Sequence, residues 1–335
     1  MRNIKKLASV VLVSLFVLSA AGCNMIEKTP EAIAKSAVAK VNGETITRGE
    51  LDSSPGIQQL IAQYKAQYGD EYTKNTEAMG SFNSQKASVL DNMVTERLIL
   101  QKAKELNIGQ DEKAVSSEVD AKIADVKKQY KTDTEFQNAL KSSGFTETTL
   151  KAYFKDQIVI QKVLDSITKD VAVKDADVQS YYTANPYKYT EKPNRINTAH
   201  ILVKTQAEAE KVKSRIDAGE DFAKVAKELS LDTATKDKGG ELGFVNYDNS
   251  GLEESFINAA LKLKVGEVSS PVQTSYGYHI IKCIAKEEYP LKSFDSVKNE
   301  IKSTLLEDAK NTATTNKLKE WRDAAKIKKY EKNLY

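Results

Sequence analysis

The sequence lacks an excess of charge of either sign. Its 335 residues include 50 lysines and arginines against 47 aspartates and glutamates. A near balance of this kind gives no electrostatic signal for nucleic acid, which is therefore not expected as a partner. The hydrophobic content is 40%, and the length leaves room for about two domains with cores of their own.

Histidine is scarce, and its scarcity argues against a metal centre. The two histidines of the chain are His200 and His279. Cys283 follows His279 by four residues in an expected strand, and a rise of roughly 3.3 Å per residue separates the pair by about 13 Å. Zinc ligands lie at about 2 Å from the metal, so no metal site is expected. A Gly-x-Ser-x-Gly motif is also missing, which disfavours a serine hydrolase.

The N-terminus carries a targeting signal. Arg2, Lys5 and Lys6 precede an uncharged run of 15 residues, 7–21, which is too short for an ordinary spanning helix. The run ends in Leu-Ser-Ala-Ala-Gly before Cys23. This ending resembles a bacterial lipobox, in which the cysteine thiol receives a diacylglycerol and the preceding segment is removed. The alternative is an ordinary secretory signal with an incidental cysteine.

Lipidation predicts a protein that is anchored to the membrane and does not span it. Residues 1–22 are then a signal peptide and residues 23–35 a lipidated tether on the extracytoplasmic face of the cell membrane, in a Gram-positive-type bacterium. Cys23 is consumed by the lipid, so Cys283 remains alone. One thiol forms no internal disulfide, and the exported protein has to be stable without one.

Residues 36–192 are expected to form a mostly helical part. Asn42-Gly43 between alternating apolar residues predicts a hairpin, and Thr47 with Glu50 predicts a capping box that opens a helix. A helix is expected to about Tyr68, followed by a loop around Gly69-Asp70 and Gly80. Apolar residues then recur at spacings of three and four, which is typical of helix packing more often than of a peptide-binding surface. These stripes include Leu90, Met93, Val94 and Leu98; Val115, Val119, Ile123 and Val126; Phe136 and Leu140; and Leu150, Phe154, Ile158 and Leu164.

Proline-containing breaks suggest two domain boundaries. Residues 187–194 have no periodicity and are interpreted as a linker, and Tyr289-Pro290 marks the second boundary. The tail from Phe294 through Trp321 and Ile327 is expected to be helical. The predicted parts are therefore 36–192, 193–287 and 288–335. They form either three domains in a row, or a central domain inserted into a helical domain whose two parts pack together.

The central block mixes strands with helices. A β-branched run predicts the first strand, and stripes at helical spacing predict the helices. The resulting order β-α-α-β-α-β-β gives a small sheet with helices packed on it, an α+β arrangement. The expected elements are strands at 196–203, 242–245, near 272 and at 278–285, and helices at 206–217, 222–229 and 252–263.

Four motifs of this block occur in the order and spacing of one family. They are the segments 195–203 (Arg-Ile-Asn-Thr-Ala-His-Ile-Leu-Val), 229–232 (Leu-Ser-Leu-Asp), 238–244 (Lys-Gly-Gly-Glu-Leu-Gly-Phe) and 274–281 (Thr-Ser-Tyr-Gly-Tyr-His-Ile-Ile). Together they resemble a parvulin-type peptidyl-prolyl isomerase domain. The segment 38–51 (VAKVNGETITRGEL) is similar to the N-terminal segment of SurA and PrsA chaperones. The chain as a whole resembles foldase lipoproteins of the PrsA type, which favours a parvulin-like domain inserted into a discontinuous, mostly α-helical chaperone domain.

The resemblance implies a set of site residues. His200, His279 and Asp232 match the family's catalytic positions. Rotation about an X-Pro amide breaks no bond, so the reaction needs no nucleophile, metal or cofactor. The matching substrate-binding positions are Leu242, Leu252 and Phe256 for the proline ring, with Thr274 as a hydroxyl partner of the histidines and Tyr276 beside the pocket.

The sequence therefore predicts a membrane-anchored extracytoplasmic peptidyl-prolyl cis-trans isomerase and foldase. Its expected partners are unfolded or partly folded exported proteins, the lipid bilayer through Cys23, and a second copy of the chain. The first alternative is a holding chaperone whose parvulin domain binds proline segments with little isomerase activity. The second is a solute-binding lipoprotein, which would have two α/β lobes with parallel sheets, and the helical flanks argue against it.

Overall fold

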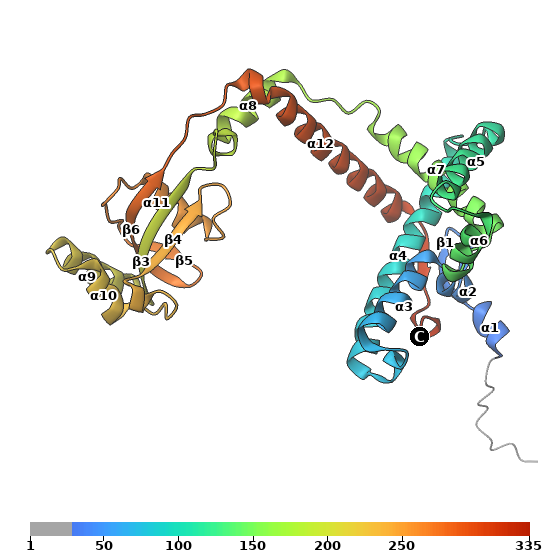
Figure 1. Ribbon diagram of the computed structural model, residues 1–335, viewed down its shortest axis with the longest axis horizontal. Helices are drawn as coiled ribbons and strands as arrows, with labels where there is room; N and C mark the ends of the chain where they lie inside the picture. The colour runs from blue at the N-terminus through green and yellow to red at the C-terminus, as the bar shows by residue number, and fades with distance from the viewer. Residues whose placement is uncertain (1–28) are drawn as a thin grey trace, which may run out of the picture. The chain divides into compact units, whose positions relative to one another are not determined.

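A computed structural model describes residues 29–335 as helices joined to two small antiparallel sheets (Figure 1). This confirms the predicted α+β class. The chain divides into two compact units. The first unit ends at Ser166 and is completed by Lys317–Tyr335, and the second unit is Ile167–Asn316. The predicted signal peptide and Cys23 lie outside the described residues.

The first unit is mostly helical, and its elements come from both ends of the described chain. Its last helix before the boundary, α7, ends just inside the second unit. The elements are α1 (Pro30–Ala34), β1 (Ala37–Val41), β2 (Glu44–Thr47), α2 (Arg48–Asp52), α3 (Pro55–Tyr68), η1 (Tyr72–Lys74), α4 (Thr76–Glu105), α5 (Glu112–Lys127), α6 (Asp133–Ser142), α7 (Glu147–Thr168), β7 (Ile327–Lys329) and η4 (Glu331–Asn333).

The predicted hairpin and its capping box are present. Asn42 and Gly43 both have positive φ, at 50° and 92°, as a tight two-residue hairpin turn requires. The Thr47 hydroxyl then accepts from the Glu50 backbone N–H at 3.2 Å, and the Glu50 carboxylate accepts from the Thr47 N–H at 2.7 Å. These bonds satisfy backbone donors at the start of α2, as a capping box does.

The predicted helical tail is wrong at its end, because Ile327 lies in a strand. The helix α12 (Phe294–Ala324) stops before it, and β7 pairs antiparallel with β1, with Val41 opposite Ile327. The sheet order is β2-β1-β7. Pairing with β1 satisfies the backbone N–H and C=O groups of this segment. The spacing of apolar residues, on which the helix was predicted, does not report such a long-range pairing. The first unit is thus closed by the end of the chain.

The loop expected around Gly80 is wrong. Gly80 lies inside α4, where the neighbouring Phe82 packs edge-on against Tyr64 with ring centroids 5.3 Å apart. This packing offsets the cost of a helical glycine, about 0.5–1 kcal/mol. Part of the predicted tether forms the helix α1, since Pro30 suits its first turn and the Thr29 hydroxyl accepts from the Ala32 N–H at 3.3 Å. The role of this segment as a tether remains a prediction.

The second unit is built on a four-stranded sheet in the order β4-β3-β6-β5. The helices α9 and α10 cover one face through a core that includes Ile201 and Val225, and α11 covers the other through Phe256 and Ile281. The predicted order of strands and helices in this block is the observed one. The elements are α8 (Asp175–Ala184), η2 (Pro186–Tyr189), β3 (Arg195–Val203), α9 (Gln206–Asp217), α10 (Phe222–Leu229), η3 (Lys236–Lys238), β4 (Glu241–Asn246), α11 (Glu254–Lys262), β5 (Val272–Thr274), β6 (Gly277–Glu287) and most of α12.

The segments on either side of the sheet pack against each other within the second unit. Tyr189 and Val178 are buried against Val297 and Ile301 of α12. The segment interpreted as a linker therefore contributes a core residue. The predicted domain boundaries at 192 and 288 both lie inside this unit, because the structure divides the chain after Ser166 and after Asn316. The boundaries at 192 and 288 remain predictions.

We predict that removing the carboxylate of Asp52 destabilises the first unit. The Lys86 side chain is 6% exposed, with its ammonium 2.6 Å from Asp52 Oδ1, and Arg48 Nε lies 2.6 Å from Asp52 Oδ2. Burial lowers the pKa of Lys86, and the Asp52 carboxylate counteracts that shift. Asp52→Ala leaves a buried cation without its partner and should lower the free energy of unfolding by about 2 kcal/mol.

Urea unfolding followed by the fluorescence of Trp321 measures this effect, because Trp321 is the single tryptophan of the sequence and lies in the first unit. The matched control is Asp70→Ala, which breaks an exposed pair with Lys65 at 3.3 Å. That change should cost no more than about 0.5 kcal/mol. Equal losses in the two variants would contradict the prediction.

Candidate active site

Two neighbouring strands place the two histidines on one face of the sheet. His200 in β3 lies opposite Ile281 in β6, and His279 in β6 lies opposite Leu202 in β3. Residues two apart on a strand share a face, so the histidines are diagonal neighbours within reach of each other. Their rings are stacked, with centroids 5.1 Å apart and 13° between the planes. Both side chains are buried.

Four side chains form a continuous set of hydrogen bonds, called here the histidine network: Thr274, His279, His200 and Asp232. The distances are 2.9 Å from Thr274 Oγ1 to His279 Nε2, 2.9 Å between the two Nδ1 atoms, and 2.8 Å from His200 Nε2 to Asp232 Oδ2. An ionised carboxylate only accepts. His200 Nε2 therefore donates to Asp232. In the tautomer with the proton of the central bond on His279, Thr274 donates to His279 and His279 donates to His200.

Asp232 is held at the end of the network by its own loop. The Thr235 hydroxyl donates to Asp232 Oδ2, and the Ala234 N–H donates to Oδ1 at 3.1 Å. Burial raises the pKa of Asp232, but the hydrogen bonds from Thr235 and His200 outweigh it and hold the pKa below its ordinary value. The carboxylate is therefore ionised at neutral pH.

His279 is held in its neutral form. Burial lowers the pKa of its imidazole to about 4, and the neighbouring His200 ring acts in the same direction. A neutral ring can accept from Thr274 and donate to His200 at the same time. The centre of the site therefore carries its hydrogen bonds without a positive charge on His279.

A cavity of about 330 Å³, called here the histidine cavity, opens beside the network. The Phe256 ring of α11 packs edge-on against both imidazoles, with centroid distances of 5.7 Å to His200 and 5.2 Å to His279. Tyr276 is 75% exposed. The structure brings together every residue that the resemblance implied for the site. The lining includes His200, Asp232, His279, Leu242, Leu252, Phe256, Thr274 and Tyr276.

Some residues of the site were not predicted. Thr235 acts through Asp232, and its only signal in the sequence is the three-residue spacing that lets a hydroxyl reach back to an aspartate. Glu253 and Leu202 also line the cavity. The Glu253 carboxylate accepts from the Ser275 N–H at 2.9 Å and from the Ser275 hydroxyl, and so connects the start of α11 to the turn between β5 and β6.

Glycine is required at two positions next to the histidine strands. A Cβ on Gly240 would lie 2.2 Å from the His200 carbonyl oxygen, and one on Gly277 would lie 2.4 Å from the Val203 carbonyl oxygen. Both residues also have positive φ, at 81° and 136°. These close approaches let the chain pass directly against β3 at each end of the site.

The arrangement suits binding of an apolar ring beside an amide. Apolar side chains form part of the cavity wall, while the histidine network offers fixed polar groups and one carboxylate. Within residues 29–335, no group of three or more His, Cys, Asp or Glu side chains is placed to hold a metal ion. The catalytic and substrate-binding roles of the individual residues remain predictions.

Comparisons with known proteins identify related chains. A family model described as the PPIC-type PPIASE domain, a rotamase, matches residues 191–285, and one described as the SurA-like N-terminal domain matches residues 1–164. Foldase protein PrsA of Clostridium kluyveri is 52% identical over 340 residues, and that of Clostridium botulinum strain Okra is 51% identical over 335 residues. Both matches cover 100% of each chain. The resemblance drawn from the sequence motifs is confirmed.

A solved structure is also similar. The crystal structure of peptidylprolyl isomerase (PrsA) from Bacillus anthracis is 32% identical in sequence. The match covers 69% of this chain and 96% of that chain, with a TM-score of 0.34.

We predict that the His279 ring stays neutral well below the pH at which a free histidine titrates. In a ¹H–¹³C NMR titration, its Cε1–H resonance should shift little between pH 8 and pH 5 and should titrate with a midpoint near pH 4. The unfolded chain binds this proton near pH 6.5. Acidification from pH 6.5 to pH 4 should therefore lower the free energy of unfolding, since the unfolded state binds more protons.

The two histidines give two such resonances, and His279→Asn assigns them because it removes one. A titration midpoint near pH 6.5 for the His279 resonance would show that the ring is not shielded as the structure indicates.

Proposed function

The chain belongs to the PrsA family of foldase proteins, and we propose that it performs isomerisation in the histidine cavity while anchored outside the cell membrane. It is a peptidyl-prolyl cis-trans isomerase of the parvulin type that assists protein folding. The observation that carries the assignment of the site is the convergence of the histidine network and Phe256 on one cavity.

The reaction rotates an amide that precedes proline. The barrier is about 18–20 kcal/mol, because the planar amide loses its resonance when it twists. Unaided rotation takes tens to hundreds of seconds. Catalysis therefore requires groups that bind the twisted amide better than the planar one.

The apolar part of the cavity favours the twisted amide. Leu242, Leu252 and Phe256 form a wall against which a proline ring can pack, which fixes one side of the rotating bond. A planar amide has a larger dipole than a twisted one, because resonance places negative charge on its oxygen. Removal of water from the amide therefore costs more in the planar state, and burial lowers the barrier.

Asp232 adds an electrostatic contribution. Its carboxylate is fixed by His200 and Thr235 and remains ionised. A negative charge beside the substrate carbonyl raises the energy of the planar amide, whose oxygen is more negative, by more than it raises that of the twisted amide. The histidines keep this carboxylate in position and shape the floor of the cavity, and neither has to transfer a proton.

The helical first unit is proposed to hold unfolded client segments. It matches the SurA-like N-terminal domain, and large apolar side chains are exposed on it: Tyr68 is 42% exposed, Leu106 51% and Tyr153 37%. Such groups can contact apolar segments of an unfolded chain. The family resemblance further implies that this part of the chain forms a homodimer.

Membrane attachment is proposed to occur through a lipid on Cys23. None of the helices in residues 29–335 is both long and apolar enough to cross a bilayer. A diacylglycerol supplies two acyl chains, which gives stable anchoring where a single chain gives only reversible binding. The clients are then partly unfolded exported proteins that emerge at the same surface.

We predict that His200→Ala, Asp232→Ala and Phe256→Ala each lower kcat/KM for a proline tetrapeptide by about tenfold or more, equivalent to about 1.4 kcal/mol in the barrier. Each change removes part of the network or of the wall that favours the twisted amide. Phe256→Ala should affect the suppression of client aggregation much less, because the first unit carries that function. The measurements are a peptide isomerisation assay and light scattering of a denatured client.

Phe244→Ala is the matched control. Its ring is 42% exposed, stacks under the Arg195 guanidinium at 5.1 Å and lies outside the histidine cavity. It should leave both activities unchanged. Equal loss of isomerisation and aggregation suppression in Phe256→Ala would argue against separate roles for the two units, and an inactive parent protein would favour the holding-chaperone alternative.

We predict that Cys23→Ala releases the protein from the membrane. Without a thiol no diacylglycerol can be attached, and the remaining chain has no lipid to hold it at the bilayer. Cell fractionation and metabolic labelling with a fatty acid measure this. Cys283→Ala is the control, because Cys283 is buried in the second unit and should have no effect on either readout. Unchanged membrane partition of Cys23→Ala would exclude the lipid anchor.

A further inference from the structure

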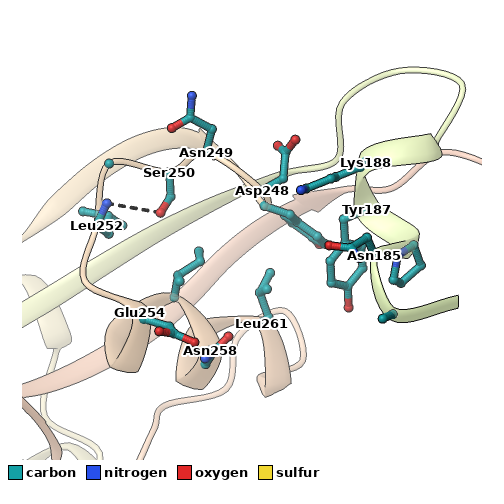
Figure 2. Close-up of a pocket in the computed structure, with 15 residues that line it drawn as sticks. Asn185, Tyr187, Lys188, Asp248, Asn249, Ser250, Leu252, Glu254, Asn258 and Leu261 are labelled. Carbon is teal, nitrogen blue, oxygen red and sulfur yellow. Dashed lines mark hydrogen bonds between the residues drawn. The ribbon is translucent and has the colours of Figure 1, made fainter. Parts of the chain in front are cut away.

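A second groove lies beside the histidine cavity in the same unit, and it is called here the flanking groove (Figure 2). Its volume is about 670 Å³. One wall is the segment 184–188, and the other consists of the connection after β4 and the helix α11. The residues that matter for its chemistry are Tyr187, Tyr247, Asp248, Asn249, Glu254 and Asn258.

The flanking groove adjoins the histidine cavity. Gly251 and Leu252 line both. The Leu252 N–H donates to the Ser250 hydroxyl at 3.1 Å, a bond drawn in Figure 2, and this fixes the loop that separates the two spaces. Because the two spaces share these lining residues, a client segment that extends from the cavity across the 250–252 loop would enter the groove.

The rim of the groove carries negative charge without a partner. Asp248 and Glu254 are exposed and lie on the same wall, Asp248 in the connection after β4 and Glu254 in α11, and neither has a hydrogen bond or ion pair among residues 29–335. Lys188 also stands at the rim, but its ammonium donates to the Tyr181 hydroxyl at 3.1 Å and lies 5.4 Å from that ring. These partners are neutral and leave the lysine charged, so the groove offers a ligand two carboxylates and one ammonium.

Aromatic and amide groups complete the surface. Tyr247 is buried, and the Tyr187 ring meets it edge-on at 5.0 Å while remaining 43% exposed. An exposed aromatic face attracts a cation. The side chains of Asn249 and Asn258 are exposed and have no hydrogen-bond partner in the described part of the chain. Each offers a donor and an acceptor, as the backbone of an extended peptide requires.

We propose that the flanking groove binds the client residues on one side of the proline and prefers a lysine or arginine there. The proposal rests on the assignment of the histidine cavity as the site of isomerisation. The basic side chain lies between Asp248 and Glu254 against the Tyr187 ring, and the peptide backbone bonds to Asn249 and Asn258. The occupant is thus an extended, basic segment of the same polypeptide whose proline fills the cavity.

Binding of fluorescein-labelled peptides to the purified full-length chain tests the proposal. Each peptide has one proline, and a single lysine or glutamate is moved from four residues before it to four residues after it. Fluorescence anisotropy should give a Kd about three- to tenfold lower for lysine than for glutamate, at positions on one side of the proline only. The difference should shrink as salt is raised.

The double variant Asp248→Asn/Glu254→Gln should bring this ratio close to one. Tyr187→Ala should weaken the lysine peptide by about two- to fivefold. The matched control is Glu210→Gln/Asp217→Asn, which removes the same charge from α9, away from both spaces. An equal preference on both sides of the proline, or one that survives the Asp248/Glu254 change, would overturn the proposal, because it would indicate only general attraction of cations.

The tetrapeptide assay separates this proposal from the assignment of the active site. Absence of a one-sided lysine preference in the unsubstituted chain, when that chain isomerises the tetrapeptide, would refute the groove alone. A chain that shows the preference but whose isomerisation is insensitive to His200→Ala and Asp232→Ala would refute the assignment of the histidine cavity and leave the groove as a peptide-binding site.

Discussion

The hydrogen bond between His200 Nδ1 and His279 Nδ1 is the contact on which the site depends. It joins two strands that are adjacent in the sheet but far apart in sequence, and it exists because their register makes the histidines diagonal neighbours. A one-residue slip of either strand would turn its histidine to the face covered by α9 and α10. Thr274 and Asp232 attach to the ends of this pair, and Phe256 packs on its side.

The site separates neutral groups from charged ones. His279 at the centre is kept neutral by burial, whereas Asp232 is ionised where its loop and His200 supply donors. Rotation about an amide transfers no proton, so the network has to keep its geometry and need not titrate. The flanking groove places further carboxylates outside this centre, where they can influence which peptide binds without altering the network.

The central block was largely predictable because its signals are local. A strand is indicated by the β-branched run at 196–203 alone, and a helix by the apolar stripe of 206–217 alone. The strand at Ile327 was missed because its partner is β1, almost the full length of the chain away. Thr235 was missed because it acts only through Asp232. The flanking groove was missed because no local signal in segments 184–188 and 247–261 shows that the fold brings them together.

The closure of the first unit by β7 has a consequence for the order in which the protein matures. Its sheet pairs β1 with β7, and nearly all of the described residues lie between these two strands. Synthesis proceeds from the N-terminus, so β1 remains unpaired along one edge until β7 becomes available. The second unit is continuous in sequence and has all its strands before then. A protein that assists the folding of others thus completes its own helical unit last.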